Sequence, residues 1–261
     1  MAVLHPKAQI DPTASVGPFA VIDEHVVIGA NCRIGPHVHL TGHTRIGSGN
    51  HFHAGCVIGD APQDLKYTDA PTRLLIGDQN VFREHVTVHR SNQAAEDTVI
   101  GSHCFLMAHC HVGHNCRLGD HVIIVNGALL AGHVQIDDRA FISGNCLIHQ
   151  FTRVGTLALM QGRAGIGKDL PPYTIARGVN GICGLNVVGL RRAGFTVEQR
   201  LELKRLYHLI FRSGRLMKNA LEEAARIFTS ASARTMIDFV ASAKRGVCMD
   251  TGTSEEGDES S

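Results

Sequence analysis

The sequence predicts a mainly β fold, a solenoid of six-residue repeats followed by a smaller α-helical domain, from three observations. A large apolar residue occupies every sixth position from Leu4 to Ile166, apart from two short interruptions. Helical spacing replaces this repeat after Pro171 and Pro172. Glycine is abundant, with 28 residues in 261, and tryptophan is absent, which suits a chain with many tight corners.

The hydrophobic repeat keeps one phase through most of the chain. In the frame of every sixth position from 4 to 166, only Asp64, Ala70 and Ala94 are not large and apolar. An α-helix would place apolar residues at spacings of three and four, and an ordinary strand would alternate by two. The period therefore indicates a repeat architecture, in which each unit buries its apolar residue against the next.

The positions around the large apolar residue repeat as well. Glycine often follows it, as at Gly47, Gly101 and Gly119, and we assign these glycines to tight corners. The residue two positions before it is usually small, and six of the eight cysteines stand there: Cys32, Cys56, Cys104, Cys110, Cys116 and Cys146. We expect these cysteines to be inward-facing packing residues, since spacings of six lack the C-x-x-C pairing of common zinc sites.

This hexapeptide pattern resembles the left-handed parallel β-helix of the bacterial hexapeptide acyltransferases. The resemblance implies a three-sided coil of about 18 residues, which we assign to residues 1–180. Two polar stretches, near 60–75 and 90–99, coincide with the failures of the frame. They are expected to be loops outside the prism, and such loops often carry function.

Residues 181–249 are assigned to a C-terminal α-helical domain that covers one open end of the solenoid. Thr196 is spaced from Gln199 as in a capping box, so a helix is expected to begin there. A second helix is expected around 215–228 and a third around 233–244.

Charge and hydropathy narrow the class of protein. Residues 250–261 hold five acidic residues and no basic one, and we expect a disordered acidic tail. The net charge of +1 provides no electrostatic footprint for nucleic acid. The N-terminus has no features of a signal peptide, and no apolar run reaches the roughly 18 residues of a spanning helix. We expect a cytoplasmic protein without stable membrane insertion.

Histidines gather at the corners of the predicted coils. His114, Gly132 and Gln150 follow one another at intervals of 18 residues, so they form one column once a coil of that length is granted. His133 and His149 flank the column. Its alignment beside a glycine distinguishes this group from histidines that we expect to be ordinary exposed corner residues: His25, His37, His39, His43, His51, His53, His103 and His121.

Six segments are similar to motifs of the UDP-N-acetylglucosamine O-acyltransferase family. They are Pro62-Gln-Asp-Leu-Lys-Tyr67, His111-x-x-His114, Leu130-Ala-Gly-His133, Ile148-His-Gln-Phe151, Asp169-Leu-Pro-Pro-Tyr173 and Gly184-x-Asn186-x-x-Gly-Leu-Arg-Arg192. The resemblance runs from the N-terminus to about residue 247. It implies the first step of lipid A biosynthesis, in which a (R)-3-hydroxyacyl group passes from acyl carrier protein to the 3-hydroxyl of UDP-N-acetylglucosamine. It also implies a homotrimer with active sites between neighbouring prisms, and no cofactor or metal beyond the phosphopantetheine of the donor.

The same resemblance implies a role for each site residue. A sugar hydroxyl needs a general base, which a neutral imidazole can supply, and His114 matches the base of the family. The backbone N–H of Gly132 matches the donor that stabilises the oxyanion. The remaining residues match substrate contacts: Asp64 and Lys66 at the glucosamine, His133 at the sugar nucleotide, His111, His149 and Gln150 along the acyl or nucleotide groove, and Asn186 and Arg192 at the nucleotide end.

Four positions qualify this resemblance. Gly162 falls where the family limits the acyl chain, and because glycine leaves the groove open we expect a long 3-hydroxyacyl donor. Asn115 follows the base where the best-known members carry an Asp that could orient the imidazole. Val188 and Ala193 stand where those members carry a Glu and an Arg toward the nucleotide. Some members use a 3-amino sugar and form an amide, and the sequence leaves that alternative open.

Three other interpretations have less support. The sister N-acyltransferase of the same pathway would need a uridine-binding domain before the repeat, whereas the repeat begins at Leu4. A zinc carbonic anhydrase on this scaffold could use His109 and His114, but its third ligand would fall near Arg73. A non-catalytic scaffold would not need the Gln63–Lys66 segment, or Asn186 with Arg192.

Overall fold

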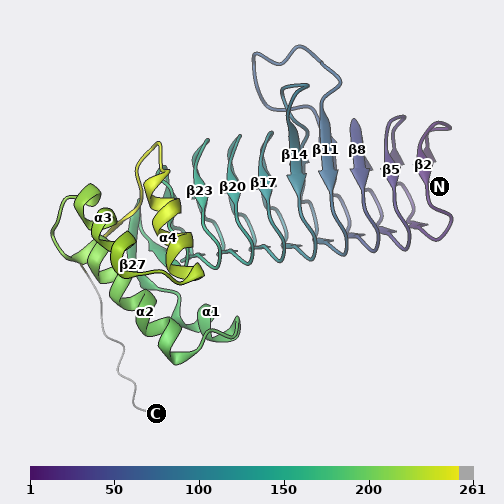
Figure 1. Cartoon of the computed structure of the whole chain (residues 1–261). Helices are drawn as coiled ribbons and strands as arrows, with labels where there is room; N and C mark the ends of the chain where they lie inside the picture. The colour runs from purple at the N-terminus through teal and green to yellow at the C-terminus, as the bar shows by residue number, and fades with distance from the viewer. Residues whose placement is uncertain (253–261) are drawn as a thin grey trace.

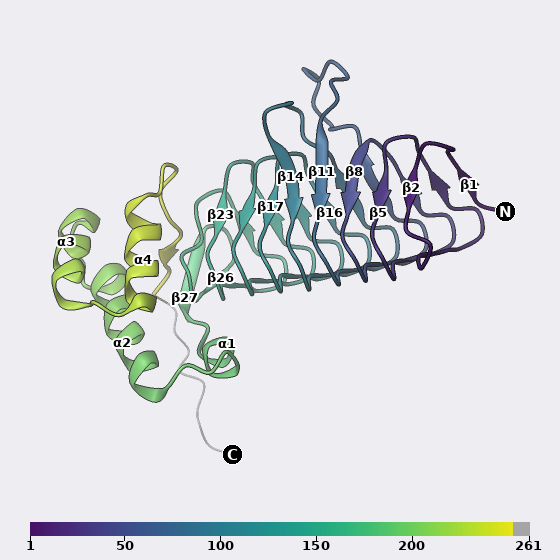
Figure 2. The same cartoon turned by 45° about the vertical axis from the view of Figure 1, so that its right-hand side comes forward.

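The computed structural model describes residues 1–252 and is a left-handed parallel β-helix with helices at its C-terminal end. Figures 1 and 2 show stacked coils that run from the N-terminus to β27 (Gly181–Leu185), with most of the helical part beyond the last coil. A loop rises from the prism between β10 and β11, halfway along its length. Within residues 1–252, no helix is long and apolar enough to cross a membrane.

Three sheets form the sides of the prism. The first sheet contains β1 (Val3–Leu4), β4 (Val21–Ile22), β7 (His39–Leu40), β10 (Val57–Asp60), β13 (Thr87–His89), β16 (His111–Val112), β19 (Leu129–Leu130), β22 (Leu147–Ile148) and β25 (Gly165–Ile166). The second contains β2 (Gln9–Ile10), β5 (Val27–Ile28), β8 (His43–Ile46), β11 (Arg73–Ile76), β14 (Asp97–Ile100), β17 (Arg117–Leu118), β20 (Gln135–Ile136) and β23 (Arg153–Val154). The third contains β3 (Ser15–Val16), β6 (Arg33–Ile34), β9 (His51–Phe52), β12 (Val81–Phe82), β15 (Phe105–Leu106), β18 (Ile123–Ile124), β21 (Phe141–Ile142), β24 (Leu159–Met160), β26 (Thr174–Arg177), β27 (Gly181–Leu185) and β28 (Met249–Asp250).

The period of six is one side of the triangular coil. Most two-residue strands end on a frame residue that points inward, and away from the two loops the frame residues pair in register with those 18 positions away, as Leu130 does with Ile148. Phe52 and Phe82 are fully buried and stack with ring centroids 4.6 Å apart. The predicted 18-residue coil is confirmed by this register.

The glycines that follow the frame residues have a different cause from the one that the sequence suggests. Gly47, Gly101 and Gly119 lie at corners, as expected, but they do not have a left-handed φ, so backbone freedom is the wrong reason for glycine there; Gly59, with a φ of 87°, is an exception in this set. The left-handed φ falls two residues later, on residues such as His103 and His121. A Cβ on Gly101 would instead lie 2.6 Å from the carbonyl oxygen of Gly119 in the next coil. Close stacking of the coils therefore requires glycine there.

The six cysteines of the repeat face inward, as expected. All are buried, and all eight cysteines of the chain are free. Five of the six thiols donate to carbonyls of the next coil, as Cys116 Sγ does to Ala131 O at 3.1 Å and Cys146 Sγ does to Gln161 O at 3.1 Å. Burial raises the pKa of Cys56, Cys110 and Cys116 to about 12. These thiols are packing groups.

We expect iodoacetamide at pH 8 to modify only the partly exposed Cys183 in the native protein. A pKa of about 12 instead of 9.0 lowers the thiolate fraction of Cys56 about a thousand-fold, and burial also blocks access. Mass spectrometry of tryptic peptides should show all eight sites alkylated in denaturant. Rapid native labelling of Cys56 or Cys116 would contradict their placement in the core.

The C-terminal part begins with the antiparallel pair β26 and β27 and continues into helices. These helices are α1 (Val187–Arg192), α2 (Val197–Tyr207), the π-helix η1 (His208–Arg212), α3 (Met217–Ile227) and α4 (Ala231–Ala241). The predicted capping box of α2 is confirmed, because Thr196 Oγ1 accepts from Gln199 N and Gln199 Oε1 accepts from Thr196 N. The short helix α1 has no counterpart in the sequence-based expectation.

The start of the acidic tail differs from the expectation. A disordered segment from 250 onward is wrong for Asp250, which pairs with Ile182 at the end of the third sheet. The Asp250 carboxylate accepts from Tyr207 Oη at 2.6 Å and from Arg212 Nε at 2.5 Å. The Asp250 carboxylate therefore joins β28 to α2 and η1. The rest of the expected tail, 253–261, lies outside the described residues.

Candidate active site

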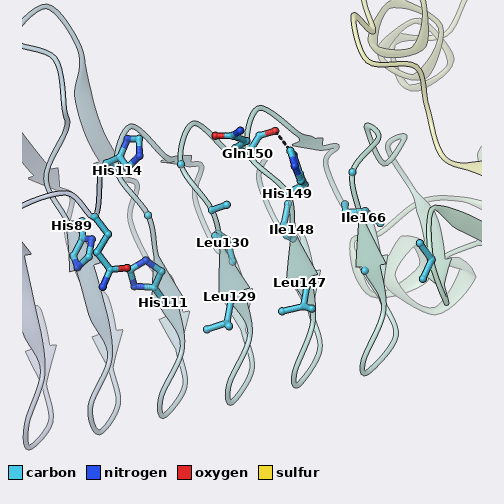
Figure 3. A pocket seen from close by; sticks show the side chains of 17 residues that line it. His89, His111, His114, Leu129, Leu130, Leu147, Ile148, His149, Gln150 and Ile166 are labelled. Atoms are coloured by element: carbon cyan, nitrogen blue, oxygen red, sulfur yellow. Dashed lines mark hydrogen bonds between the residues drawn. The ribbon is translucent and has the colours of Figure 1, made fainter. Parts of the chain in front are cut away.

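A groove of about 660 Å³ runs along the first sheet, beside its corner with the second sheet. Its wall is apolar along β19, β22 and β25, where Leu129 and Leu147 are exposed. Its other end holds His89, His111 and His114. Figure 3 shows Leu129 and Leu147 on neighbouring strands, with His114 and Gln150 at corners two coils apart. The groove thus joins an apolar channel to a cluster of imidazoles.

His114 has one ring nitrogen held and the other directed along the column. Its Nδ1 lies 2.8 Å from Asn115 Oδ1. Because an amide oxygen can only accept, Nδ1 carries the proton and Nε2 is left with a lone pair. A neutral imidazole with a free Nε2 can take a proton from a hydroxyl group.

Gly132 lies directly against this imidazole, as the predicted column requires. A Cβ at Gly132 would stand 2.6 Å from both Cε1 and Nε2 of His114. Among residues 1–252, no acceptor is found for the Gly132 N–H, whereas the neighbouring His133 N–H donates to His114 O at 2.9 Å. The glycine therefore makes room for the base and leaves one backbone donor free beside it.

Asn115 is buried, and both polar atoms of its side chain are hydrogen-bonded: Oδ1 to His114, and Nδ2 to residues of the neighbouring loop. Its Oδ1 also accepts from Asn92 N at 3.0 Å. Its Nδ2 donates to Ser91 Oγ at 2.8 Å and to Glu96 Oε2 at 2.9 Å. All four groups around Asn115 come from the adjacent loop or from the base itself. The loop between β13 and β14 thus sets the orientation of the imidazole.

The loop between β13 and β14 also contacts Asp64, a residue of the raised loop between β10 and β11. Asn92 Nδ2 donates to Asp64 Oδ2 at 2.7 Å, and Lys66 N donates to Asp64 Oδ1 at 2.9 Å. The hydrogen bond from the Lys66 N–H, followed by that from Asn92 and the nearby His114, lowers the pKa of the Asp64 carboxyl. Asn92 therefore links the carboxylate to the base, while the Lys66 side chain is exposed.

The raised loop, residues 61–72, is anchored by Arg90. Arg90 Nη1 donates to Gly59 O at 3.0 Å and Nε donates to Tyr67 Oη at 3.3 Å. The guanidinium also lies 5.6 Å from the centre of the Tyr67 ring, and Tyr67 Oη donates to Ala70 O at 2.6 Å. One side chain therefore positions the segment that carries Asp64.

We expect Arg90→Ala to raise the amide hydrogen-exchange rate of residues 61–72 by at least about tenfold, since each lost bond to a charged donor contributes roughly 1.5–3 kcal/mol. Coils away from the loop, such as the one containing β20, should exchange unchanged. Arg90→Lys keeps the charge but not the fork of donors, so it should give an intermediate rate. Unchanged exchange in Arg90→Ala would rule out this anchor.

His89 and His111 form an edge-to-face pair at the polar end of the groove, with ring centroids 4.7 Å apart. Thr87 Oγ1 lies 2.7 Å from His111 Nδ1. Burial, with smaller effects from His89 and His114, lowers the pKa of His111 to about 4. Burial also lowers the pKa of His89. Both rings are therefore neutral at physiological pH, so neither places a positive charge beside His114.

His133, His149 and Gln150 occupy the corner in different ways. The His133 ring lies edge-on to His114 at 5.2 Å and stacks on Phe151 at 4.5 Å. Burial, together with the nearby His114, lowers the pKa of His133. His149 and Gln150 are exposed and line the groove. The structure thus brings the column and both flanking histidines together.

Asp64, Lys66 and His133 lie near this groove without lining it, and His133 lines a hollow on the outer side of the corner. Gly162, Asn186 and Arg192 do not line the groove within one chain either. Gly162 lies at the corner between the third and first sheets, where a Cβ added to it would lie 3.6 Å from Gly144 O. Asn186 is buried and caps α1, because its Oδ1 accepts from Gly189 N at 2.9 Å and its Nδ2 donates to Leu157 O at 2.9 Å. Arg192 is exposed at the end of α1.

Sequence reasoning missed several residues of the site. His89 takes the place after the frame residue Val88 that glycine usually holds, and this exception was the available signal. Asn92 and Glu96 belong to a loop whose conformation no periodicity describes. The expectation that this loop carries function could mark the segment, but not its individual residues.

The ligand geometry does not favour the zinc alternative. Within residues 1–252, no three His, Cys, Asp or Glu side chains are grouped so that they could hold a metal ion. Arg73, at the place of the third ligand, pairs with Asp97 through Nε to Oδ1 at 2.7 Å. The His109 ring stacks on that of His85 at 5.1 Å.

The chain is similar to proteins of one enzyme family. The family model described as Udp N-acetylglucosamine O-acyltransferase, domain 2, matches residues 169–248, and that of the bacterial transferase hexapeptide (six repeats) matches 25–60 and 97–132. The acyl-(acyl-carrier-protein)–UDP-N-acetylglucosamine O-acyltransferase of Halorhodospira halophila is 43% identical over 256 residues, which is 95% of this chain and 99% of that relative.

Solved structures agree with this similarity. The UDP-N-acetylglucosamine acyltransferase of Francisella novicida is 38% identical and superposes with a TM-score of 0.92, covering 96% of this chain and 93% of that one. The enzyme of the same name from Arabidopsis is 31% identical, with a TM-score of 0.86 over 95% of this chain and 98% of that one. The likeness thus extends over both the β-helix and the helical part.

Proposed function

The chain belongs to the UDP-N-acetylglucosamine O-acyltransferase family, and from this premise we propose how its groove carries out the family reaction. The protein is an acyltransferase of lipid A biosynthesis. It transfers an acyl group from acyl carrier protein to UDP-N-acetylglucosamine, the first step of that pathway. The group transferred is a (R)-3-hydroxyacyl chain, and it moves from the phosphopantetheine thioester to the 3-hydroxyl of the sugar.

The orientation of His114 is the observation that carries this mechanism. Nδ1 is held by Asn115 Oδ1 at 2.8 Å, so Nε2 removes the proton of the sugar hydroxyl as its oxygen attacks the thioester carbon. The tetrahedral intermediate collapses with cleavage of the C–S bond. The departing thiolate takes the proton back from the imidazolium, which regenerates the base.

Gly132 stabilises the oxyanion of that intermediate. Its N–H has no acceptor within residues 1–252 and lies beside the His114 ring. A backbone donor that is already in place costs no reorganisation during the reaction. The negative charge that develops on the thioester oxygen is therefore stabilised by the Gly132 N–H, which lies on the same edge of the coil as His114.

The polar contacts divide between the two substrates. Asp64 and Lys66 hold the glucosamine, with Asp64 fixed by Asn92, and His133 contacts the sugar nucleotide. His111, His149 and Gln150 line the groove along which the acyl chain or nucleotide lies. Two further residues serve the nucleotide end: Arg192 with its charge, and Asn186 through the helix that it caps.

A homotrimer brings the distant residues into the groove. The outward side chains of the third sheet form an apolar row of half-buried residues, whereas the second sheet presents Arg117, Gln135 and Arg153. The apolar row consists of Val81, Phe105, Ile123, Phe141 and Leu159. Such a row is typical of a subunit interface. Analytical ultracentrifugation should give a trimer.

The acyl chain lies along Leu129, Leu147 and Ile166, and Gly162 of a neighbouring protomer leaves its far end open. We expect Gly162→Leu to lower kcat/KM for the longest donors by at least about tenfold, since one methylene in an apolar pocket is worth that much. Short donors should be unaffected. A Cβ at Gly162 meets its own chain only at 3.6 Å, from Gly144 O, so folding should not change. Equal loss for all chain lengths would contradict this placement.

The donor carries its own phosphopantetheine, so the reaction needs no further cofactor or metal. Acyl carrier protein and the sugar nucleotide are both cytoplasmic reactants, and we place the protein in the cytoplasm with them.

The decisive assay mixes the protein with UDP-N-acetylglucosamine and a panel of acyl-carrier-protein thioesters and detects acylated nucleotide by mass spectrometry. The expected product is an ester, which mild alkali hydrolyses, with long 3-hydroxyacyl donors preferred. An alkali-resistant product formed only from a 3-amino sugar would replace the ester reaction with amide formation. Preference for short donors would remove the assignment of Gly162.

A further inference from the structure

Glu96 accepts a hydrogen bond from Asn115, the residue that orients His114. Its Oε2 accepts from Asn115 Nδ2 at 2.9 Å and lies 3.8 Å from His133 Nδ1. The Glu96 side chain is about half exposed, at 49%, whereas Asn115 is 5% exposed. A carboxylate at the rim thus reaches the base through one buried amide.

The Glu96 carboxylate and the Asn92 N–H together decide which way the Asn115 amide faces, because the first can only accept and the second can only donate. An ionised carboxylate has only acceptors, so the NH₂ group of Asn115 must face Glu96. The amide oxygen is then left for His114, whose Nδ1 must donate. If the amide turned over, its oxygen would face the Glu96 carboxylate and its NH₂ would force the proton of His114 onto Nε2.

We infer that Glu96 is a positioning residue for the general base, which acts with the Asn92 N–H to fix the tautomer of His114 through Asn115. The inference rests on the role of His114 proposed above. It also implies that Glu96 and Asn115 form a matched pair, one charged and one neutral. The charge sits one residue further from the imidazole than it would on an acidic residue at 115.

The matched pair predicts a specific incompatibility. Asn115→Asp would place a second carboxylate about 2.9 Å from the first, and two charges at that distance cannot both remain ionised in place. Either one binds a proton or Glu96 turns out to solvent. In the double variant Glu96→Gln with Asn115→Asp, the new amide donates to the new carboxylate. The bond is then restored with its direction reversed, and the charge lies directly on His114.

Other charged groups around the base are unchanged in this comparison. Asp64 acts on His114 from the raised loop, and His89 and His111 face it from the groove. On the outer side, His133 lies beside Glu96, and the hollow there is lined by more distant side chains: Arg117, Arg153, Asp169, Lys244 and Arg245. Glu96 is the carboxylate that bonds to Asn115.

The test measures kcat, KM and the pH profile of kcat/KM for wild type, Glu96→Gln, Asn115→Asp and the double variant. Glu96→Gln should lower kcat about three- to tenfold without raising KM, and should move the acid limb of the profile to lower pH because imidazolium loses a stabilising charge. Asn115→Asp alone should lower kcat about a hundredfold. The double variant should recover at least about tenfold of that loss, with its acid limb above that of Glu96→Gln.

A merely structural role for Glu96 would give additive losses and an unmoved acid limb, and either result would overturn the inference. Asp97→Asn is the matched control, because Asp97 is the next carboxylate along the chain but pairs with Arg73. Its profile should be that of wild type. A His114→Ala variant completes the series: if it keeps full activity, the proposed base fails; if it is inactive and the double variant shows no recovery, only the role of Glu96 fails.

Discussion

Replacing His114 by alanine is expected to lower kcat by about 10²–10⁴-fold, the usual contribution of a positioned general base. The KM for both substrates should change little, because the imidazole acts on the proton of the attacking hydroxyl and not on the rest of either substrate. The Asn115 amide would lose one of its four partners but keep Asn92, Ser91 and Glu96. Thermal unfolding should therefore stay close to that of wild type.

His103→Ala is the matched control for this variant. His103, like His114, stands at a corner of the coil, although only His103 has a left-handed φ. It stacks on His121 at 4.8 Å and does not line the groove. Its removal should leave kcat within a factor of about two, as expected for a surface substitution. Undiminished turnover of His114→Ala in the steady state, with the control behaving as stated, would remove His114 from the chemistry.

The period of six predicts a repeat, and its resemblance to the hexapeptide acyltransferases identifies that repeat as a β-helix. One side of the coil is six residues long, with a large apolar residue at one inward position and a small residue two positions earlier. Frame residues such as Phe52, Phe82 and Leu130 are all fully buried. The phase also places His114 and Gly132 on adjacent coils, and the register of Val112 with Leu130 confirms that they are neighbours. A strictly periodic backbone turns spacing along the chain into distance in space.

The limits of that prediction lie where the period breaks. The hydrogen bonds of Asn92 to Asp64 and of Glu96 to Asn115 join two loops, and no frame relates residues in loops of unequal length. The pairing of Thr87 with Val57 spans 30 positions, not 18, for this reason. Side-chain chemistry alone could not indicate which loop residue holds the base.

The glycines show a second limit. The sequence indicated one cause, backbone freedom at tight corners, for the glycines that follow the frame residues. Gly59 does have a left-handed φ of 87°, but Gly101 is required by the carbonyl of the next coil, and Gly132 by the imidazole of His114. These causes predict different results on substitution, since a carbonyl in a sheet cannot move away and a side chain can.

Gly132→Ala is therefore expected to remove activity while sparing the fold. The new methyl group would occupy the space 2.6 Å from His114 Nε2, so the ring must turn away and lose its bond to Asn115. A displacement of about 1 Å at a catalytic group can cost about 10²-fold in kcat, and the Gly132 N–H would no longer have the base beside it. The unfolding temperature should fall by no more than about 2 °C, because only a side chain at the rim moves.

Gly167→Ala gives the matched comparison in the same groove. A Cβ there would meet His149 Cβ at 3.7 Å, an ordinary contact, so kcat should stay within about threefold of wild type. If both variants lose activity equally, the groove as a whole resists added volume and the glycine beside the base has no special place. Suppose instead that only Gly132→Ala loses activity, and that the NMR signals of His114 shift while those of His103 do not. The loss of activity then follows from the displaced imidazole of His114. The absence of a side chain at 132 is in that case as much a part of the catalytic site as the histidine itself.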